Sequence, residues 1–446
     1  MSNQFSLLQE TRFRPFFFTQ FLGAFNDNVF KTALITLVAF HAASLTSIDG
    51  GALATVLPGL FILPFFLFSA TAGQIADKFE KSQIIRLVKV FEICIMLFAS
   101  SGFFLHNIWL LATALFMMGM HSTLFGPVKY SYLPQHLKEH ELIGGNGVVE
   151  MGSFVAILLG QVLGAWLSTQ HNHELLTSVA ILGIAVMGYW TSRGVPHSPA
   201  ADSRLKINWN PFTETYKNVK LIWSNQTIWL AIIAISWFWF YGATFLTQFP
   251  NFAKVVLHGD ESVFILLLSI FSLGIGIGSL MCEKLSKGKV ELGLVVFGAM
   301  GLTIFGVDLH NASGHIMQNI PNNVLHNVSS FTHHLAHWRL LTDIALIGLF
   351  GGFYIVPLYV LIQTRSEKTH QSRVIAANNI MNALFMVLSV GFSILIFKQG
   401  FNISQLFLAT ALLNIVITIY LCVRQPEYLT TFIDWVKRSI CSKQIV

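Results

Sequence analysis

The sequence predicts an all-α integral membrane protein whose twelve transmembrane helices form two halves of six. Hydrophobic residues make up 54% of the chain and charged residues only 11%, whereas soluble domains carry about 25% charge. The mean hydropathy is +0.63. Charged residues and Gly or Pro breaks separate apolar runs that each reach the roughly 20 residues needed to cross a bilayer. The formal charge of +6 is spread between these runs, so no nucleic acid partner is expected.

Twelve candidate spans follow one another along the chain. They cover residues 14–42, 52–76, 82–104, 107–134, 143–168, 174–192, 226–250, 261–284, 289–309, 338–364, 374–398 and 403–424. They predict an N-terminal six-helix bundle at 1–192, a linker at 193–225, a C-terminal six-helix bundle at 226–425 and a tail at 426–446. Within the linker, Pro211 to Trp223 has the pattern of an amphipathic helix on the membrane surface.

The distribution of Lys and Arg predicts the orientation. Of the 27 basic residues, 21 lie at the two ends, in the linker and in the loops on the same side. Because positively charged loops stay in the cytoplasm, both termini are expected to be cytoplasmic. The N-terminus lacks the apolar core of a removable signal peptide. The four cysteines are far apart and predict neither a disulfide framework nor a zinc site.

The first span carries polar side chains near membrane depth, namely Gln20, Asn26, Asp27, Asn28 and Lys31. Gln20, Asp27 and Lys31 share one helix face, and Gly23 lies on the same face. An ionisable group in hydrocarbon costs on the order of 3 kcal/mol, so this face should meet protein or a watery cavity. We favour the wall of a substrate cavity. The alternative is helix packing, in which Asp27 pairs with Lys31.

The two halves show signs of an internal repeat. The segment after the second span aligns Asp77 and Lys78 with Glu283 and Lys284 after the eighth. Later in each half Pro127 matches Pro357, and the residue pairs Asn146 with Asn378 and Glu150 with Asn382 follow. Together these matches favour a duplicated six-helix bundle.

The segment Gly73-Gln-Ile-Ala-Asp77-Lys78-Phe-Glu-Lys81 resembles the loop signature of the major facilitator superfamily, with Glu80 in place of the usual glycine. This resemblance implies six plus six helices around a central cavity. The segments QFLGAFNDNVFK, Gly126-Pro127-Val-Lys129-Tyr130 and Glu141 to Met151 are similar to the bacterial lysophospholipid transporter family. The second half departs from that family, because the region Gly242 to Gln248 lacks its arginine and Asn382 replaces its glutamate.

Several further polar side chains are candidates for binding a lipid headgroup. Lys129 offers a point charge for a phosphate, unless it snorkels to the cytoplasmic interface. Asn146 and Glu150 share a helix face and offer a carboxylate for an ammonium group. The asparagines of the eleventh span, Asn378, Asn379 and Asn382, offer neutral donors and acceptors. For Glu150 and the asparagines, the alternative is polar packing between helices.

The seventh span is rich in aromatic residues, and we single out Trp237, Tyr241 and Gln248. These side chains line either an apolar slot for an acyl chain or an aromatic belt at the membrane interface.

The loop signature predicts a charge latch on the cytoplasmic side. Asp77 is placed to cap the start of a neighbouring helix and to pair with a basic residue. The basic residues Lys78, Lys81 and Arg86 are expected to meet carboxylates such as Glu92 or Glu150. The alternative for the basic residues is plain anchoring on the cytoplasmic side. The full candidate set for gating is Gly73, Asp77, Lys78, Lys81, Arg86, Glu283 and Lys284.

Other function classes find little support. The segment His310 to His337 holds six of the sixteen histidines, and we expect a solvated, disordered loop there rather than a metal site. No phosphate-binding loop, nucleophile elbow, zinc-protease motif or dinucleotide glycine pattern occurs, so neither an enzyme nor a cofactor is expected.

The family resemblance implies a flippase of the bacterial inner membrane that moves lysophospholipids to the cytoplasmic side by alternating access. It also implies an acyltransferase and acyl–carrier-protein synthetase that re-acylate the lipid, and we expect the transporter to be monomeric. Acidic residues inside spans are few (Asp27, Glu92, Glu150, Asp343), which favours downhill transport. The alternatives are a proton-coupled exporter of an amphipathic drug or metal chelator, and a membrane receptor that binds lipid or metal without transport.

Overall fold

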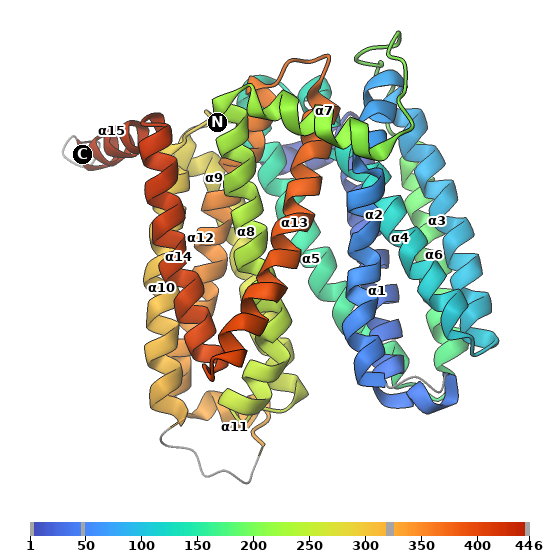
Figure 1. The fold of residues 1–446 in the computed structure, drawn as a ribbon, viewed down its shortest axis with the longest axis vertical. Coiled ribbons are helices and arrows are strands. Elements are labelled where there is room, and N and C mark those ends of the chain that lie inside the picture. The colour runs from blue at the N-terminus through green and yellow to red at the C-terminus, as the bar shows by residue number, and fades with distance from the viewer. Residues whose placement is uncertain (1–3, 46–49, 318–324, 442–446) are drawn as a thin grey trace. The chain divides into compact units, whose positions relative to one another are not determined.

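The computed structural model describes residues 4–45, 50–317 and 325–441, and its regular elements are helices (Figure 1). In the first half a 3-10 turn at Gln4–Gln9 precedes α1 (Arg14–Leu45), α2 (Gly50–Lys78), α3 (Lys81–Phe104), α4 (Ile108–His136), α5 (Leu142–Ser168) and α6 (His173–Ser192). The linker contains α7 (Pro211–Trp223). The second half comprises α8 (Gln226–Asn251), α9 (Glu261–Ser286), α10 (Gly293–Met317), α11 (Val328–His333), α12 (Leu335–Arg365), α13 (Gln371–Lys398), α14 (Ile403–Arg424) and α15 (Glu427–Cys441).

Each predicted span corresponds to one long helix, and most of the predicted ends fall within a few residues of the observed ones. The largest difference is at α10, which was predicted to end at residue 309 but continues to Met317. The extension is polar. Its His310 Nδ1 lies 2.8 Å from Ser404 Oγ of α14, and Ser313 also bonds that hydroxyl. Contacts with a neighbouring helix therefore prolong α10 beyond the apolar run.

Eleven helices in the described part of the chain are long and apolar enough to cross a membrane. They match every predicted span except the first. The helix of the first predicted span, α1, has 32 residues and is long enough to cross a membrane.

Chain contacts divide the molecule into two compact units. Unit 1 comprises residues 1–138, 155–225 and 363–383, and unit 2 comprises 139–154, 226–362 and 384–446. Unit 1 therefore includes the first half of α13, and unit 2 includes the first half of α5. The division at 192 and 226 derived from the sequence stays a prediction.

In unit 1, small residues let helices approach closely, as in many membrane proteins. Gly160 and Gly164 of α5 lie against the backbone of α1, and an added Cβ at Gly164 would meet the Val29 carbonyl oxygen at 2.4 Å. The apolar core on the other side of α1 includes Phe30, which contacts Phe103 of α3 edge-on. The polar residues of α1 are thus held between packed helices.

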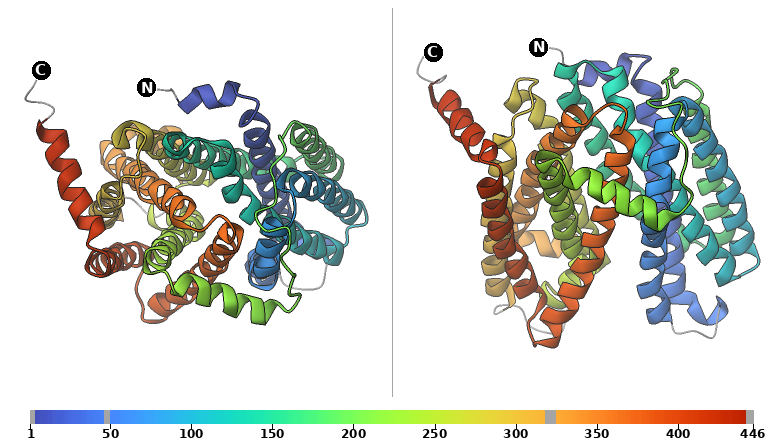
Figure 2. Two further views of the ribbon diagram at one scale, coloured as in Figure 1. Left: turned by 90° about the horizontal axis from the view of Figure 1, so that it is seen from above. Right: turned by 45° about the horizontal axis from the view of Figure 1, so that its top comes forward.

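Unit 2 has a comparable glycine seam and an aromatic core. An added Cβ at Gly278 of α9 would lie 2.0 Å from the Leu349 carbonyl oxygen of α12. Phe245 and Phe407 stack with their ring centroids 4.2 Å apart. Viewed from above, the long helices are seen nearly end-on while α15 lies lengthwise, so it runs across the end of α14 (Figure 2). There Trp435 donates to the Leu285 carbonyl oxygen at 3.1 Å.

The linker helix α7 has the bounds predicted from the sequence. Asn210 caps its start by accepting hydrogen bonds from the backbone of Phe212 and Thr213. Glu214 and Asn218 face the protein, whereas Phe212, Tyr216 and Trp223 are exposed. The aromatic side is therefore turned outward, as expected of a helix that lies on a lipid surface. Its position on the membrane stays a prediction.

The expectation of a disordered histidine-rich loop is wrong for its described part. Residues 310–317 belong to α10, and α11 occupies Val328–His333, while 318–324 lie outside the described residues. His337 is buried, stacks on Phe331 and has Nδ1 2.6 Å from the Phe331 carbonyl oxygen. Packing of these rings orders a segment whose composition alone suggested a solvated loop.

Candidate functional site

The polar side chains of α1 make different kinds of contact within unit 1. Asn26 is fully buried, and its Nδ2 donates to Glu92 Oε1 of α3 at 2.7 Å. Asn28 instead donates to the carbonyl oxygen of Ala24 on its own helix. Gln20 is also buried. Asn26 therefore links α1 to an ionisable group on another helix, whereas Asn28 satisfies its own helix.

Asp27 and Lys31 do not pair with each other, so the packing alternative derived from the sequence is wrong on this point. Ser122 Oγ of α4 donates to Asp27 Oδ2 at 2.6 Å. The Lys31 ammonium lies 5.2 Å from the ring centroid of Phe61 in α2, a cation–π distance. The Asp27 side chain is 13% exposed. Its second oxygen, Oδ1, has no hydrogen-bond partner among the described residues.

A buried group of ionisable side chains lies behind Asp27. Lys89 Nζ donates to Glu92 Oε2 at 2.6 Å, and His121 Nε2 lies 3.2 Å from the same oxygen. The other ring nitrogen, His121 Nδ1, is 4.0 Å from Asp27 Oδ1. Lys89 and Glu92 are 1% and 0% exposed. We call Asp27, Lys89, Glu92 and His121 the charge cluster.

Two glycines make room for the Lys89 ammonium. An added Cβ at Gly23 of α1 would lie 2.8 Å from Lys89 Nζ, and one at Gly188 of α6 would lie 3.2 Å away. The Lys89 ammonium therefore reaches Glu92 through a space between α1 and α6, which stays open because Gly23 and Gly188 have no side chains. A buried ion pair needs such exact placement, because its desolvation cost is offset only by good geometry.

The sequence interpretation did not assign Lys89, Glu92 and His121 to the site. A signal was present, because Lys89 and Glu92 are three residues apart within an apolar span, where ionisable groups are expensive. His121 gave a weaker signal, since a single histidine in a span is compatible with simple packing. Only the packing of α3 and α4 against α1 brings the three groups to Asp27.

The remaining candidates of unit 1 lie on α4 and α13. The Lys129 ammonium is 5.0 Å from the ring centroid of Tyr130. Asn379 approaches α4 where an added Cβ at Gly126 would lie 2.6 Å from its Nδ2. Asn378 is buried and both its amide atoms lack hydrogen-bond partners among the described residues, while Asn382 is buried as well. The first part of α13, which belongs to unit 1, thus contributes the amide groups of three asparagines to this unit.

Two candidates lie in the half of α5 that belongs to unit 2. Asn146 is fully buried and donates to the Leu142 carbonyl oxygen at 2.8 Å. Glu150 is also buried. On the same helix, Met151 packs near Gly276 of α9. That these groups meet Lys129 and the charge cluster around one substrate stays a prediction.

The aromatic candidates of α8 lie in the core of unit 2. Trp237 Nε1 donates to Asn414 Oδ1 of α14 at 2.8 Å, and the Tyr241 hydroxyl donates to the Leu302 carbonyl oxygen of α10 at 3.0 Å. Both side chains are buried, so neither belongs to an exposed aromatic belt. Gln248 is half-buried near the end of the helix. Their part in binding an acyl chain stays a prediction.

Asp77 makes the two kinds of contact expected of it. Its Oδ1 accepts the backbone N–H of Ser372 at the start of α13, and its Oδ2 accepts Arg373 Nε, both at 3.0 Å. An anion at a helix start is stabilised by the helix dipole and by unpaired N–H groups. At Gly73 an added Cβ would lie 2.7 Å from Ala376 Cβ, so the glycine permits this close approach. The gating role of these contacts stays a prediction.

The expectation that the basic loop residues meet Glu92 is wrong, whereas a contact with Glu150 stays a prediction. The Lys78 ammonium lies over the Phe79 ring at 5.7 Å, and Arg86 Nη2 donates to the Val195 carbonyl oxygen at 3.1 Å. The backbone N–H of Lys81 donates to Ser198. Glu92 is unavailable to these residues because it is enclosed in the charge cluster. The Arg86 side chain and the Lys81 backbone therefore attach the start of the linker.

Glu80, the departure from the superfamily signature, has a structural use. Its carboxylate caps α3 by accepting the backbone N–H groups of Ser82 and Gln83, and it also accepts the N–H of Ser198 at 2.7 Å. Partial burial opposes ionisation, but these donors outweigh it and lower the pKa of Glu80. Glu80 thus fastens the linker to the loop.

The second-half counterparts of the loop residues lie at the end of α9. Lys284 is exposed and Glu283 is half-buried. The chain then turns at Lys287, which has φ 55°, and at Gly288, whose N–H donates to the Glu283 carbonyl oxygen at 3.2 Å. The counterpart segment therefore forms a helix-ending turn.

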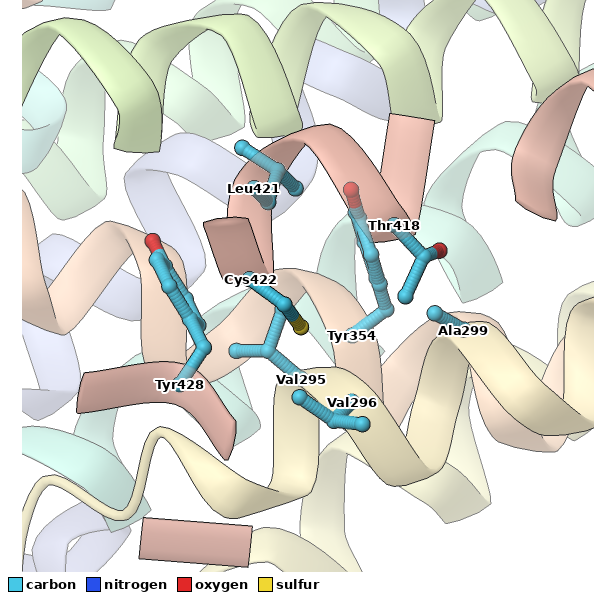
Figure 3. Close-up of a pocket in the computed structure, with 8 residues that line it drawn as sticks. All are labelled: Val295, Val296, Ala299, Tyr354, Thr418, Leu421, Cys422 and Tyr428. Carbon is cyan, nitrogen blue, oxygen red and sulfur yellow. The ribbon is translucent and has the colours of Figure 1, made fainter. Parts of the chain in front are cut away.

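A cavity in unit 2 is too small for a lipid headgroup. It measures about 10 Å³, the space of one water molecule (Figure 3). It is lined by Val295, Val296, Ala299, Tyr354, Thr418, Leu421, Cys422 and Tyr428. Both tyrosine hydroxyls lack hydrogen-bond partners among the described residues, so one bridging water suits the space. A shallow apolar groove of about 210 Å³ lies beside it between α10 and α14.

The fold and the loop contacts agree with a comparison of the whole sequence. The family model of the Major Facilitator Superfamily matches residues 16–317. The chain belongs to this superfamily. It is a multi-pass membrane transporter, and the twelve-helix fold class predicted from the sequence is confirmed.

Two relatives and one solved structure show which proteins of the superfamily the chain is similar to. The lysophospholipid transporter LplT of Enterobacter sp. (strain 638) is 25% identical over 386 residues, which cover 85% of this chain and 87% of that protein. LplT of Photorhabdus laumondii subsp. laumondii is 26% identical over 396 residues, which cover 86% and 87%. The crystal structure of the human organic anion transporter MFSD10 covers 92% of this chain and 99% of its own, with a TM-score of 0.70 at 11% identity. The similarity to MFSD10 concerns the fold alone.

Proposed function

We propose that this protein moves lysophospholipids across a bacterial inner membrane to the cytoplasmic side, by alternating access. The similarity to lysophospholipid transporters over 85% of the chain supports this substrate class. The asymmetry of Lys and Arg supports cytoplasmic termini. An acyltransferase on the cytoplasmic side would then consume the imported lipid.

The observation that carries the proposal is the state of Asp27. A carboxylate inside a membrane span is costly, and the Asp27 side chain is 13% exposed, while its Oδ1 is buried and lacks a hydrogen-bond partner among the described residues. The exposed part of this carboxylate suits the ammonium of an ethanolamine headgroup. Lys31, one turn further along α1, offers a positive charge for the phosphate. Two opposite charges in this spacing match a zwitterionic headgroup.

The latch at Asp77 supports an alternating-access cycle. Its bonds to Ser372 and Arg373 tie α2 to the start of α13 within unit 1. Breaking and remaking them is a discrete two-state event of the kind that transporters use. The acyl tail would stay along apolar helix faces while the headgroup crosses.

The test is uptake of labelled lysophosphatidylethanolamine by proteoliposomes that contain the full chain. The wild-type protein should move the lipid to the inner leaflet, where albumin added outside no longer extracts it. Asp27→Ala should abolish uptake because it removes the proposed ammonium ligand. Asp434→Ala, an exposed aspartate on α15, is the matched control and should retain uptake.

Folding is checked by size-exclusion chromatography and by the thermal unfolding midpoint of each variant. Uptake by a folded Asp27→Ala protein equal to that of the wild type would contradict the headgroup assignment. Efflux of another solute that depends on a pH gradient, with no lipid uptake, would favour an exporter. Binding of the lipid without movement would favour a receptor.

A further inference from the structure

The last helix, α15, packs on unit 2 through one row of aromatic side chains. This aromatic row comprises Tyr428, Phe432 and Trp435, which follow one another at spacings of four and three residues and so share a helix face. Phe432 lies against the start of α10, where an added Cβ at Gly293 would be 2.8 Å from the Phe432 Cα. Trp435 lies beside the Phe297 ring of α10, with the ring centroids 5.3 Å apart, and Tyr428 is buried. The aromatic row is therefore the side of α15 that faces the protein.

A second row, which follows the first by one residue at each position, is aliphatic. This aliphatic row comprises Leu429, Ile433 and Val436. Leu429 is 45% exposed and Ile433 is 42% exposed, while Val436 is half-buried. Each residue turns by about 100° around a helix axis, so the aliphatic row lies about a quarter turn from the aromatic row. It is thus directed away from the contacts that hold α15 on unit 2.

A third row, one further residue along, is polar. It comprises Thr430, Asp434 and Lys437, and all three side chains are exposed. Water therefore suits the polar row, whereas the protein covers the aromatic row. The aliphatic row lies between these two sides, and removing its apolar surface from water is favourable.

The course of α15 shows which way the aliphatic row points. Seen from above in the left view of Figure 2, α15 runs along the edge of unit 2 toward the C-terminus, with the other helices of unit 2 on its right. The aromatic row faces those helices. A right-handed helix turns clockwise as it recedes from an observer at its start, so the aliphatic row lies a quarter turn clockwise from the right, on the side away from the reader. The spanning helices of unit 2 run in that direction, so the aliphatic row faces the membrane.

The preceding helix, α14, leads the chain from the acyl chains to this position. Val416, Ile419 and Val423 lie on one side of α14, and each is more than half exposed, as expected of side chains that face lipid. Pro426 then ends α14, because a proline lacks the backbone N–H that would continue the helix, and Gln425 before it is not helical (φ −136°, ψ 88°). The chain therefore leaves a helix that faces lipid through a sharp turn and enters one that lies across it.

Lipid fits the aliphatic row better than another protein does. The residues that carry the binding energy of protein interfaces are mostly Trp, Tyr and Arg, and a stable interface uses about 20–30 residues on each side. The aliphatic row offers three side chains of other types. A helix in the membrane surface needs an apolar side, a polar side and an axis in the membrane plane. α15 has both sides, and it lies lengthwise in the view in which the spanning helices are seen nearly end-on (Figure 2).

We infer that α15 is an interfacial helix whose aliphatic row lies in the boundary between the lipid headgroups and the acyl chains. The tail at 426–446 was predicted only as a cytoplasmic segment, and the inference assigns its helix to the membrane surface. Trp435 donates to the Leu285 carbonyl oxygen at the end of α9, and Arg438 Nη2 donates to Glu291 Oε2 at 2.6 Å. Through these contacts a lipid-bound α15 holds the connection between α9 and α10 at the level of the membrane surface. The inference does not depend on which substrate the protein moves.

The first experiment measures the depth of spin labels on α15 in the full chain, reconstituted in vesicles of phosphatidylethanolamine and phosphatidylglycerol. Labels are attached at Ile433→Cys and at Asp434→Cys, the matched neighbour on the polar row, in a protein whose native cysteines are replaced by alanine. Power saturation with oxygen and with a water-soluble nickel complex should place the label at position 433 about 5–10 Å below the headgroups. The label at position 434 should be reached by the nickel complex. Leu429→Cys and Thr430→Cys repeat this comparison one turn earlier.

The second experiment keeps the native cysteines, so it also covers the case in which the cysteine-free protein does not fold. The photoreactive amino acid p-benzoylphenylalanine is incorporated in place of Ile433 or of Asp434, and the protein is illuminated in the same vesicles. Mass spectrometry then identifies the crosslinked products. The protein modified at position 433 should form lipid adducts, and the protein modified at position 434 should not.

Three outcomes overturn the inference. The first is a label at position 433 that the nickel complex reaches as readily as the label at position 434, because the aliphatic row then faces water. The second is an equal yield of lipid adducts from the two positions. The third is crosslinking of position 433 to a second copy of the chain in place of lipid, which would make the aliphatic row a contact between copies. Each outcome is read without a transport assay, so failure of the proposed lipid transport leaves the inference intact.

Discussion

The first helix of each half, α1 and α8, solves the problem of polar groups inside a membrane differently. In α1, Asp27 and Lys31 are ionisable and Asn26 contacts the ionisable Glu92, and the partners of these three come from α2, α3 and α4. In α8, Trp237 and Tyr241 donate to a neutral amide and to a backbone carbonyl of other helices. Both helices are held in packed bundles, but only α1 of the two brings charged side chains into its bundle.

The contacts of the two helices differ in what they respond to. A neutral hydrogen bond such as that of Trp237 holds helices together and does not respond to pH or to a charged ligand. The ionisable groups of the charge cluster would attract the charged headgroup proposed above. We therefore expect substitutions in the cluster of unit 1 to change transport and stability together, and substitutions of the α8 contacts to change mainly stability.

The largest effect should come from unpairing the buried ions. Lys89→Met leaves Glu92 without its ammonium, and loss of one member of a buried pair costs about 3–5 kcal/mol. The thermal unfolding midpoint of the purified protein should fall sharply. The double variant Lys89→Met/Glu92→Gln removes both charges and should recover much of that loss. A double variant less stable than Lys89→Met would show that the pair is not the stabilising unit.

A smaller effect is expected from the glycines, and it should differ between the units. Gly278→Ala places a methyl group 2.0 Å from the Leu349 carbonyl oxygen, and because backbone has to move the cost is about 1–3 kcal/mol or more. Gly23→Ala meets the movable end of Lys89 at 2.8 Å, and alanine favours a helix by about 1 kcal/mol. Its unfolding midpoint should fall less than that of Gly278→Ala, because only the Lys89 ammonium has to shift within its pair with Glu92. Equal losses in the two variants would contradict the distinction between backbone and side-chain contacts.

The smallest effect should come from α8. Trp237→Phe keeps an aromatic ring but leaves Asn414 Oδ1 without its donor, which costs about 1–2 kcal/mol. The loss should appear as a modest fall in unfolding midpoint, and lipid uptake per folded molecule should be retained. Loss of uptake without loss of stability would instead place Trp237 among the substrate ligands. The neighbouring Trp239, partly exposed, provides a Trp239→Phe control.

The fold could be predicted well because each span carries its own evidence. Apolar length marks a membrane helix without knowledge of its neighbours, and this is why the bounds of most spans agree with the sequence-based ones. The bounds of α7 followed from its own amphipathic pattern. The exceptions are instructive. The end of α10 and the histidine-rich segment before α12 are ordered by contacts with Ser404 and Phe331, which lie on other elements or turns of the chain.

The candidate site could be predicted only in part. Asp27 was identified because a carboxylate in a span is conspicuous by itself. Its partners Ser122 and His121 were not identified, because nothing in the sequence of α4 distinguishes them. They meet Asp27 only when α4 packs against α1. The loop pattern predicted that Asp77 caps a helix and pairs with a basic residue. It did not predict that this residue is Arg373, which is almost three hundred residues away in the sequence.

The amino-acid sequence by itself determined the membrane class, the twelve helices and the presence of charge in the first of them, since hydropathy and spacing are local properties. Tertiary structure alone decided which charges meet. Glu92 pairs with Lys89 through the space left by Gly23 and Gly188, and His121 is set between two acids. Electrostatic interactions depend on distances of a few ångströms between helices, and these distances are fixed only when the helices pack.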